Sequence, residues 1–238
     1  MKCEIINTGV GRASENMAFD AALFKEMFHR SHPILHLYDW KRSSLTYGYF
    51  IREEDFFLDA NLRNDWDIAR RSTGGGIVFH NGDFAFSFFM PSHHVKFSRE
   101  IVLNYRFVNS CLVEVFRKFF GETVVLTSGD GESDNEVSRN FCMAKITKYD
   151  VVLDGKKVGG AAQRTSRHGF LHQGTMFLSR PSEKNFHDVF KSDIAEILFH
   201  DFGKYSFFPL GEEVCPNYLE EVRKELRQDL IEIMKERL

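Results

Sequence analysis

Three consecutive glycines, Gly74 to Gly76, stand inside the stretch RRSTGGGIVFHNGDFAFSFF, which otherwise clusters apolar residues as a β-strand does. Glycine loses more backbone freedom on folding than any other residue, so a triplet is costly unless the fold requires it. The triplet therefore predicts one of two features. Either the chain turns where other residues cannot, or a ligand or another part of the protein comes close to this backbone.

The composition limits the classes of protein that this chain can belong to. It has 238 residues, 43% of them hydrophobic, which is enough for one large core or two small ones. A net charge of −3 with scattered lysines and arginines argues against a general nucleic-acid binder. None of the four cysteines forms a CxxC pair, and we expect no metal site. We also expect a cytoplasmic protein with reduced cysteines and no membrane partner, because no signal stretch or long apolar run is present.

Hydrophobic periodicity predicts the main elements. Helices are expected over 13–28, over 98–120 and in the charged tail from Tyr218; strands are expected over 33–40, 43–50, 66–71, 77–80, 83–90 and 170–178. Asn81-Gly82 between two strands is a strong hairpin signal, and Asp154-Gly155 marks a second hairpin within 149–164. The polar segment 126–140 is expected to be a loop. These elements predict an α+β (mixed α/β) fold with a central, largely antiparallel sheet flanked by helices. We expect a single domain over 1–238, with a C-terminal helical tail over about 180–238.

Basic residues stand beside small residues twice, in Arg70–Gly76 and in Lys156–Ala162. Small residues let a ligand lie flat on the backbone, whose free N–H groups can bind phosphate or carboxylate oxygens. A neighbouring cation offsets the charge of such a ligand. The spacing differs from the Walker loop and from the dinucleotide fingerprint. The pair predicts a shared binding site, although a tight turn also explains one glycine triplet. His80 is either a strand-end histidine or a substrate contact.

The segments RRSTGGGIVFHNGDFAFSF, YDVVLDGKKVGGAAQR and GFLHQGTMFL resemble, in this order, those of the lipoate–protein ligase and octanoyltransferase family. ENMAFDAAL, LYDW and SLTYGYF match the opening order of that family, so the resemblance covers roughly 15–178. Family members attach lipoyl or octanoyl groups to one lysine of a small carrier domain. They share their catalytic fold with biotin ligases. The resemblance therefore implies a biotin/lipoate ligase-type catalytic domain.

The resemblance also implies the residues of the site. Lys157 matches the signature lysine of the family, whose ammonium stabilises the charge that grows near the acyl carbonyl and the α-phosphate. Lys156 is expected to be a solvated neighbour. The residues implied in binding the nucleotide phosphates and the acyl group are Arg71, Ser72, Gly74, Gly75, Gly76, Ile77, Val78, Phe79, His80, Gly159, Gly160 and Ala161.

Cys142 lies seven residues before Tyr149, which resembles the spacing of stand-alone octanoyltransferases, where the thiol carries the acyl group as a thioester. A thiolate is a strong nucleophile, and we expect Lys145, Lys148 or Lys157 to favour it. An inert thiol remains the alternative. The order of His172 and Gln173 is exchanged relative to the Gln-His-Gly form of the family, so no role is assigned to His172.

Three functions remain open at this point. The main prediction is a lipoate–protein ligase that uses ATP and Mg²⁺ to join lipoate or octanoate to a lysine through an acyl-adenylate. The alternative is an octanoyl or lipoyl acyltransferase that forms a Cys142 thioester from an acyl-carrier donor and needs no cofactor. The third is a non-catalytic carrier-binding relative, because fold does not guarantee activity.

The implied partners are lipoyl carrier domains, namely those of 2-oxoacid dehydrogenase acyltransferase subunits and the glycine cleavage H protein. Acyl carrier protein and a separate accessory subunit are further candidates, and no nucleic-acid partner is expected. We expect Arg164 and Arg167 to steer an acidic carrier domain towards the site. We also expect the 126–140 loop to be mobile and to close over the ligand as a lid.

Overall fold

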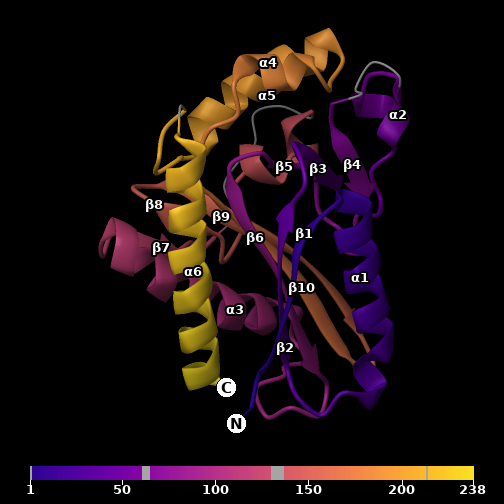
Figure 1. Cartoon of the computed structure of the whole chain (residues 1–238), viewed down its shortest axis with the longest axis vertical. Helices are drawn as coiled ribbons and strands as arrows, with labels where there is room; N and C mark the ends of the chain where they lie inside the picture. Colours follow the sequence, from indigo (N-terminus) through magenta and orange to yellow (C-terminus); the bar gives the residue numbers. More distant parts are fainter. Residues whose placement is uncertain (1, 61–64, 130–136, 213) are drawn as a thin grey trace.

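The computed structural model describes residues 2–60, 65–129, 137–212 and 214–238. Its main sheet has seven strands in the order β1-β2-β6-β10-β9-β8-β7 (Figure 1). β1 runs parallel to β2, and every other neighbouring pair is antiparallel. The largely antiparallel sheet and its flanking helices confirm the predicted fold class. The strands are β1 Glu4–Gly11, β2 Ile34–Trp40, β6 Asp83–Pro91, β7 Val124–Leu126, β8 Val151–Leu153, β9 Lys156–Ser166 and β10 Gly169–Phe177.

A second, three-stranded sheet has the order β4-β3-β5 and packs beside the main sheet (Figure 1). Its strands are β3 Ser44–Tyr47, β4 Asp67–Arg70 and β5 Val78–His80. The helices are α1 Ala13–Glu26, α2 Glu53–Phe56, α3 Ile101–Phe120, α4 Glu183–His187, α5 Ser192–Tyr205 and α6 Pro216–Arg237. Single 3-10 turns are η1 Met27–His29, η3 Ser138–Asn140 and η4 Cys142–Ala144.

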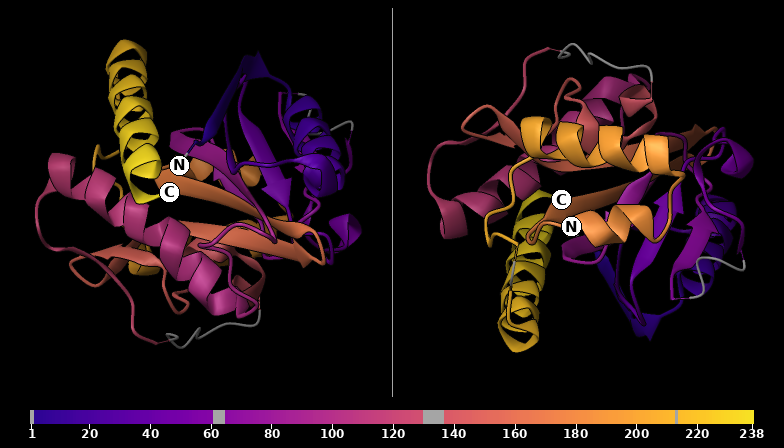
Figure 2. Two further views of the ribbon diagram at one scale, coloured as in Figure 1. Left: turned by 90° about the horizontal axis from the view of Figure 1, so that it is seen from below. Right: turned by 90° about the horizontal axis from the view of Figure 1, so that it is seen from above.

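The alternation of β6 explains how the main sheet is covered on two faces. Phe84, Phe86 and Phe88 point into a core that α3 and α6 share, whereas Phe89 packs on the other side with Leu171 and α1. Figure 2 shows α1 and α3 on different sides of the sheet. The pocket described below lies on the α1 side, between the two sheets, and α3 and α6 form the opposite layer.

Asn81-Gly82 does not close a hairpin, so that prediction is wrong. β5 pairs with β3 in the small sheet and β6 pairs with β2 and β10 in the main sheet, so the two residues join the sheets. Neither residue has the positive φ that the favoured two-residue turn requires. The second hairpin is confirmed, because Asp154 and Gly155 have φ values of 50° and 77° between paired β8 and β9.

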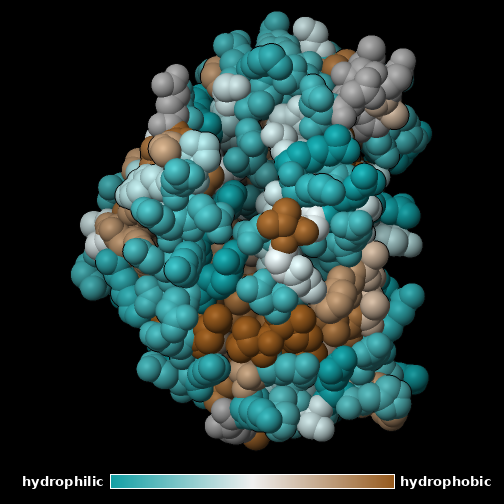
Figure 3. Space-filling model, viewed as in Figure 1, coloured by the Kyte–Doolittle hydropathy of each residue, from teal (hydrophilic) through white to brown (hydrophobic). Residues whose placement is uncertain are grey.

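The helix predicted in the tail is also confirmed as α6, whose Val222, Leu226, Leu230 and Ile233 are buried. On the face seen in Figure 3, hydrophilic residues cover most of the surface, and an apolar patch lies over the lower parts of β1 and β2. Among the described residues, no helix is both long enough and apolar enough to cross a membrane.

Candidate active site

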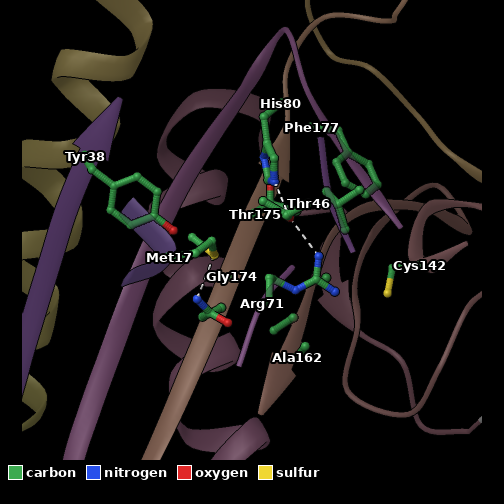
Figure 4. A pocket seen from close by; sticks show the side chains of 14 residues that line it. Met17, Tyr38, Thr46, Arg71, His80, Cys142, Ala162, Gly174, Thr175 and Phe177 are labelled. Atoms are coloured by element: carbon green, nitrogen blue, oxygen red, sulfur yellow. Dashed lines mark hydrogen bonds between the residues drawn. The ribbon is translucent and has the colours of Figure 1, made fainter. Parts of the chain in front are cut away.

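A pocket opens between the two sheets, beneath the end of β5 (Figure 4). Its empty volume is about 410 Å³, the open mouth included. Most of its wall is apolar or is bare backbone, and Arg71 and Cys142 bring a cation and a thiol to it. The lining residues are Met17, Tyr38, Thr46, Arg71, Val78, His80, Cys142, Gly160, Ala161, Ala162, Gln173, Gly174, Thr175 and Phe177.

Arg71, which follows β4, carries a buried charge and is only 5% exposed. Its Nη1 donates to Thr46 Oγ1 at 2.7 Å, and its Nη2 donates to the carbonyl oxygens of Gly74 at 3.2 Å and Gly76 at 2.7 Å. Burial lowers the pKa of this guanidinium from its ordinary value. Within the described part of the chain no carboxylate forms an ion pair with it. The pocket therefore favours a ligand or transition state that carries negative charge beside Arg71.

The glycine triplet both turns and allows a close approach between backbones. Gly75 has a φ of +82°, in the left-handed region that favours glycine. A Cβ on Gly76 would overlap the carbonyl oxygen of Asn140, and one on Gly48 would overlap the carbonyl oxygen of Gly75. The approaching segment is thus the protein itself, namely the residues that lead into Cys142.

This close approach brings the Cys142 thiol to the triplet. The Gly76 N–H donates a hydrogen bond to Cys142 Sγ at 2.9 Å. A Cβ added to Gly75 would lie 3.3 Å from that Sγ and 3.4 Å from Arg71 Nη2, so the thiol and the guanidinium face the same space (Figure 4). A backbone N–H and a nearby cation both stabilise a thiolate.

We expect Gly76→Ala to lower the free energy of unfolding by about 1–3 kcal/mol, since its methyl group must displace the Asn140 backbone. Urea denaturation measures this loss. Gly74→Ala is the matched control, because a Cβ there meets no atom within 4 Å. Equal stability of the two variants would contradict the close approach.

Lys157 on β9 reaches the same wall, but its charge is compensated. Its Nζ donates to Asp150 Oδ2 at 2.6 Å and to the Lys145 carbonyl oxygen at 3.2 Å, and the residue is 2% exposed. A Cβ on Gly160, which lines the pocket, would lie 2.9 Å from that Nζ. The ammonium therefore lies beside Gly160 on the face of β9 that the pocket uses, as one half of a buried ion pair.

A second buried network fixes the opposite end of the pocket wall. Gln173 Nε2 donates to Asp20 Oδ2 at 2.6 Å, and its Oε1 accepts from Thr73 Oγ1 at 2.7 Å. Asp20 also bonds His36 Nδ1 at 2.8 Å. The loop that carries the triplet is thus tied to β10 and α1, which limits how far it can move.

Comparison with known proteins shows which family the chain belongs to. Residues 12–211 match the family model described as the lipoyl protein ligase A/B catalytic domain. The chain belongs to the lipoyl protein ligase A/B family. The octanoyltransferase LipM of Macrococcus caseolyticus is 28% identical over 179 residues, which are 73% of this chain and 65% of that protein. The octanoyltransferase LipM of Kyrpidia tusciae is 30% identical, over 76% of this chain and 68% of that protein. This chain thus spans about two thirds of the length of these relatives.

The fold agrees with that assignment to the lipoyl protein ligase A/B family. A bipartite lipoate protein ligase from Thermoplasma acidophilum, solved in a study that included its E2 lipoyl domain, superposes with a TM-score of 0.69. The superposition covers 99% of this chain and 84% of that one at 20% identity, so it supports the fold alone.

The site residues predicted by family resemblance divide into three groups. Arg71, Val78, His80, Cys142, Gly160 and Ala161 line the pocket, Gly74, Gly75, Gly76 and Lys157 lie next to lining residues, and the other four face elsewhere. Ile77 and Phe79 instead belong to the core around α5. Gly159 faces Met176, and Ser72 turns its carbonyl oxygen to Arg164.

The structure brings a different cation to Cys142 from the lysines that sequence reasoning named. Arg71 lies there, whereas Lys148 stands over the ring of Tyr149 and the Lys157 ammonium is paired with Asp150. Ala162, from the predicted small-residue segment Lys156–Ala162, also lines the pocket. Sequence reasoning missed further lining residues, for which spacing gave no signal: Met17, Tyr38, Thr46, Gln173, Gly174, Thr175 and Phe177.

The structure locates the two arginines that were predicted to steer a carrier domain, and part of the predicted lid. Arg164 lies 5.6 Å above the ring of Phe24, and Arg167 donates to His168, so both are near the α1 end of the sheet. The predicted lid spans 126–140, and its central residues 130–136 lie outside the described residues. At its end, the carbonyl oxygen of Asn140 accepts from the Ile77 N–H at 2.8 Å.

His172 faces away from the pocket into the core beneath α3, where it stacks on Phe86. Burial lowers the pKa of His172 from 6.5 to about 3. Between these values the unfolded chain binds a proton that the native protein does not, so stability falls as the pH drops below 6.5.

Because of this histidine, we expect the free energy of unfolding to be about 2–3 kcal/mol lower at pH 4.5 than at pH 8. His172→Phe keeps a ring beside Phe86 and should lose correspondingly less over that range. Urea unfolding at both pH values measures the difference, with exposed His187→Gln as the control. A pH dependence equal to that of wild type in His172→Phe would contradict the assignment.

Proposed function

We propose that the chain is an acyltransferase that moves an octanoyl or lipoyl group from a thioester donor, through Cys142, to a lysine of a lipoyl carrier domain. The observation that carries the proposal is the position of Cys142 Sγ. It accepts a hydrogen bond from the Gly76 N–H at 2.9 Å and shares the pocket with the buried Arg71, which forms no ion pair with a carboxylate of the described residues. The similarity to octanoyltransferases supports the same chemistry.

The reaction has two balanced halves. The Cys142 thiolate attacks the carbonyl carbon of the donor thioester, a new C–S bond forms, and the donor sulfur leaves and takes a proton from solvent. The neutral acceptor amine then attacks the Cys142 thioester, forms the amide, loses a proton to solvent and releases the thiolate. Because the bond energy of one thioester passes to the next, no ATP is consumed.

Each half passes through an oxyanion, which needs a positive partner in a site from which water is excluded. The Arg71 guanidinium supplies that charge beside Cys142. Lys157 adds a positive group beside Gly160, while Asp150 fixes its position. The bare surface of Gly160, Ala161 and Ala162 leaves room for the acyl chain.

An ATP-dependent ligase is the second candidate. Arg71 forms no ion pair with a carboxylate of the described residues, so its charge beside bare backbone also suits an acyl-adenylate phosphate. In that reaction Arg71 and the triplet would hold the phosphate and Lys157 the acyl carbonyl, and ATP would supply the activation. Among the described residues no cluster of three or more His, Cys, Asp and Glu side chains is placed to hold a metal ion. Mg²⁺ would then bind through the phosphates and not through a protein cage.

The deciding experiment follows intact masses of the enzyme and of a lipoyl domain. With octanoyl-loaded acyl carrier protein and no ATP, we expect the enzyme to gain one octanoyl group and the lipoyl domain to gain it next. With free octanoate, ATP and Mg²⁺, we expect no modification. The reverse pattern would establish the ligase, and no modification in either case would support a non-catalytic relative. The lipoyl domains of 2-oxoacid dehydrogenase acyltransferase subunits and the glycine cleavage H protein are the acceptors to compare.

A further inference from the structure

A chain of buried polar groups leads from Arg71 to a carboxylate that does not touch it. Arg71 Nη1 lies 2.7 Å from Thr46 Oγ1, which lies 2.7 Å from His80 Nε2. His80 Nδ1 lies 2.6 Å from Asp83 Oδ2, which also accepts from Thr175 Oγ1 at 2.5 Å. All five residues are at most 6% exposed. They come from four different strands and the end of β4, so the contacts depend on the tertiary fold.

The donors in this chain have only one consistent order when His80 is neutral. A carboxylate only accepts, so His80 Nδ1 donates to Asp83 and Nε2 must accept. The Thr46 hydroxyl therefore donates to Nε2. Its oxygen is then free to accept from Arg71, which only donates. Each group fixes the orientation of the next, and the chain ends on the guanidinium at the pocket.

His80 has no free nitrogen for a substrate in this arrangement. Its ring is also stacked on Trp40, with centroids 4.1 Å apart and planes at 23°. The imidazole is thus held on its face and at both nitrogens. Such a ring is suited to hold a neighbour in place, and not to contact an acyl group directly.

Asp83 does not contact Arg71 directly, which leaves the positive charge of the guanidinium without a neutralising partner at this end. A carboxylate in direct contact would neutralise the guanidinium, as Asp150 does for Lys157. Thr46 and His80 stand between Asp83 and Arg71, so no carboxylate touches the guanidinium and its positive charge remains available to Cys142 while its position is fixed. The other guanidinium nitrogen is held by the carbonyl oxygens of Gly74 and Gly76.

We infer that Thr46, His80 and Asp83 are positioning residues that hold the Arg71 guanidinium against the Cys142 thiolate. The catalytic consequence rests on the proposed thioester chemistry, whereas the effect on the thiol does not. Arg71 acts on the reacting atoms, and the other three act through it.

The test measures the reactivity of the thiol without any acyl donor. In a Cys215→Ala background, which removes the exposed thiol, the rate of Cys142 alkylation by iodoacetamide is followed by intact mass. We expect Thr46→Val and Arg71→Met each to slow alkylation about tenfold, because the reactive thiolate loses its cation. Thr46→Ser keeps the hydroxyl and should restore most of the rate. Thr46→Val combined with Arg71→Met should be no slower than Arg71→Met alone.

Wild-type alkylation in Thr46→Val, or effects that multiply in the double variant, would overturn the inference. If Thr46→Val fails to fold, which its melting temperature would show, His80→Phe is used in its place because it keeps a ring on Trp40. It should slow the alkylation of Cys142 as Thr46→Val would, and alkylation at the wild-type rate would overturn the inference. With an octanoyl donor, the variants should lower kcat for acylation and leave KM nearly unchanged. Alkylation that depends on Arg71 in a protein that never accepts an acyl group would reject the proposed function alone. Acylation with unaltered thiol reactivity would reject the positioning role alone.

Discussion

Replacing Cys142 by alanine should slow octanoyl transfer by about 10⁴-fold or more, since removal of a covalent nucleophile leaves only binding and electrostatic assistance. The acyl-enzyme should disappear from the intact mass spectrum at the same time. The rate is measured as gain of octanoyl by a lipoyl domain, with octanoyl-loaded carrier protein in excess. The free energy of unfolding should change little, because the thiol makes one hydrogen bond, to Gly76.

Cys215→Ala is the matched control, because that thiol is exposed and lies in the segment before α6. It should transfer octanoyl at the wild-type rate. An adenylate-forming ligase needs no protein nucleophile, so a Cys142→Ala variant that joins octanoate to the lipoyl domain with ATP as fast as wild type would reject the thioester mechanism.

Local patterns in the sequence were sufficient to predict the long helices that cover the sheet. The stripe of Val108, Leu112 and Val115 predicted α3, and Gly121 ends it with a φ of +89°. β1 was missed because it is a half-exposed edge strand without clear alternation, and a bulge at Gly9 interrupts its pairing. The pairing error at Asn81-Gly82 has a different cause, since a turn signal reports a change of direction and not the sheet to which the next strand belongs.

The candidate site was predictable only where its chemistry is local. The triplet and its arginine are adjacent in sequence, and Asp150 and Lys157 lie on one hairpin. Cys142 meets Gly76 across 66 positions, and Thr46 meets Arg71 across 25. No spacing rule links such pairs. Which cation would lie at the thiol was therefore a question that only the fold could answer.

Lys157→Met should lower the free energy of unfolding by about 3–5 kcal/mol, because it leaves Asp150 as a buried carboxylate without its cation. Of the residues that the structure describes, only Thr147 would still donate to Asp150 Oδ2, through its N–H at 2.7 Å and its hydroxyl at 2.8 Å. Octanoyl transfer should fall by about 10²–10³-fold as well, the effect expected for the loss of one group that stabilises an oxyanion. Urea denaturation and the transfer assay measure the two effects separately.

A double variant separates structure from catalysis at this pair. Asp150→Asn combined with Lys157→Met removes the unpaired charge, so it should regain most of the stability while transfer remains slow. Lys156→Met is the control, because this exposed neighbour donates to the Gly203 carbonyl oxygen at 3.2 Å and forms no ion pair within the described part of the chain. It should match wild type in both assays. If the double variant recovered the transfer rate together with its stability, Lys157 would serve the fold alone. The positive charge that the reaction requires would then come from Arg71.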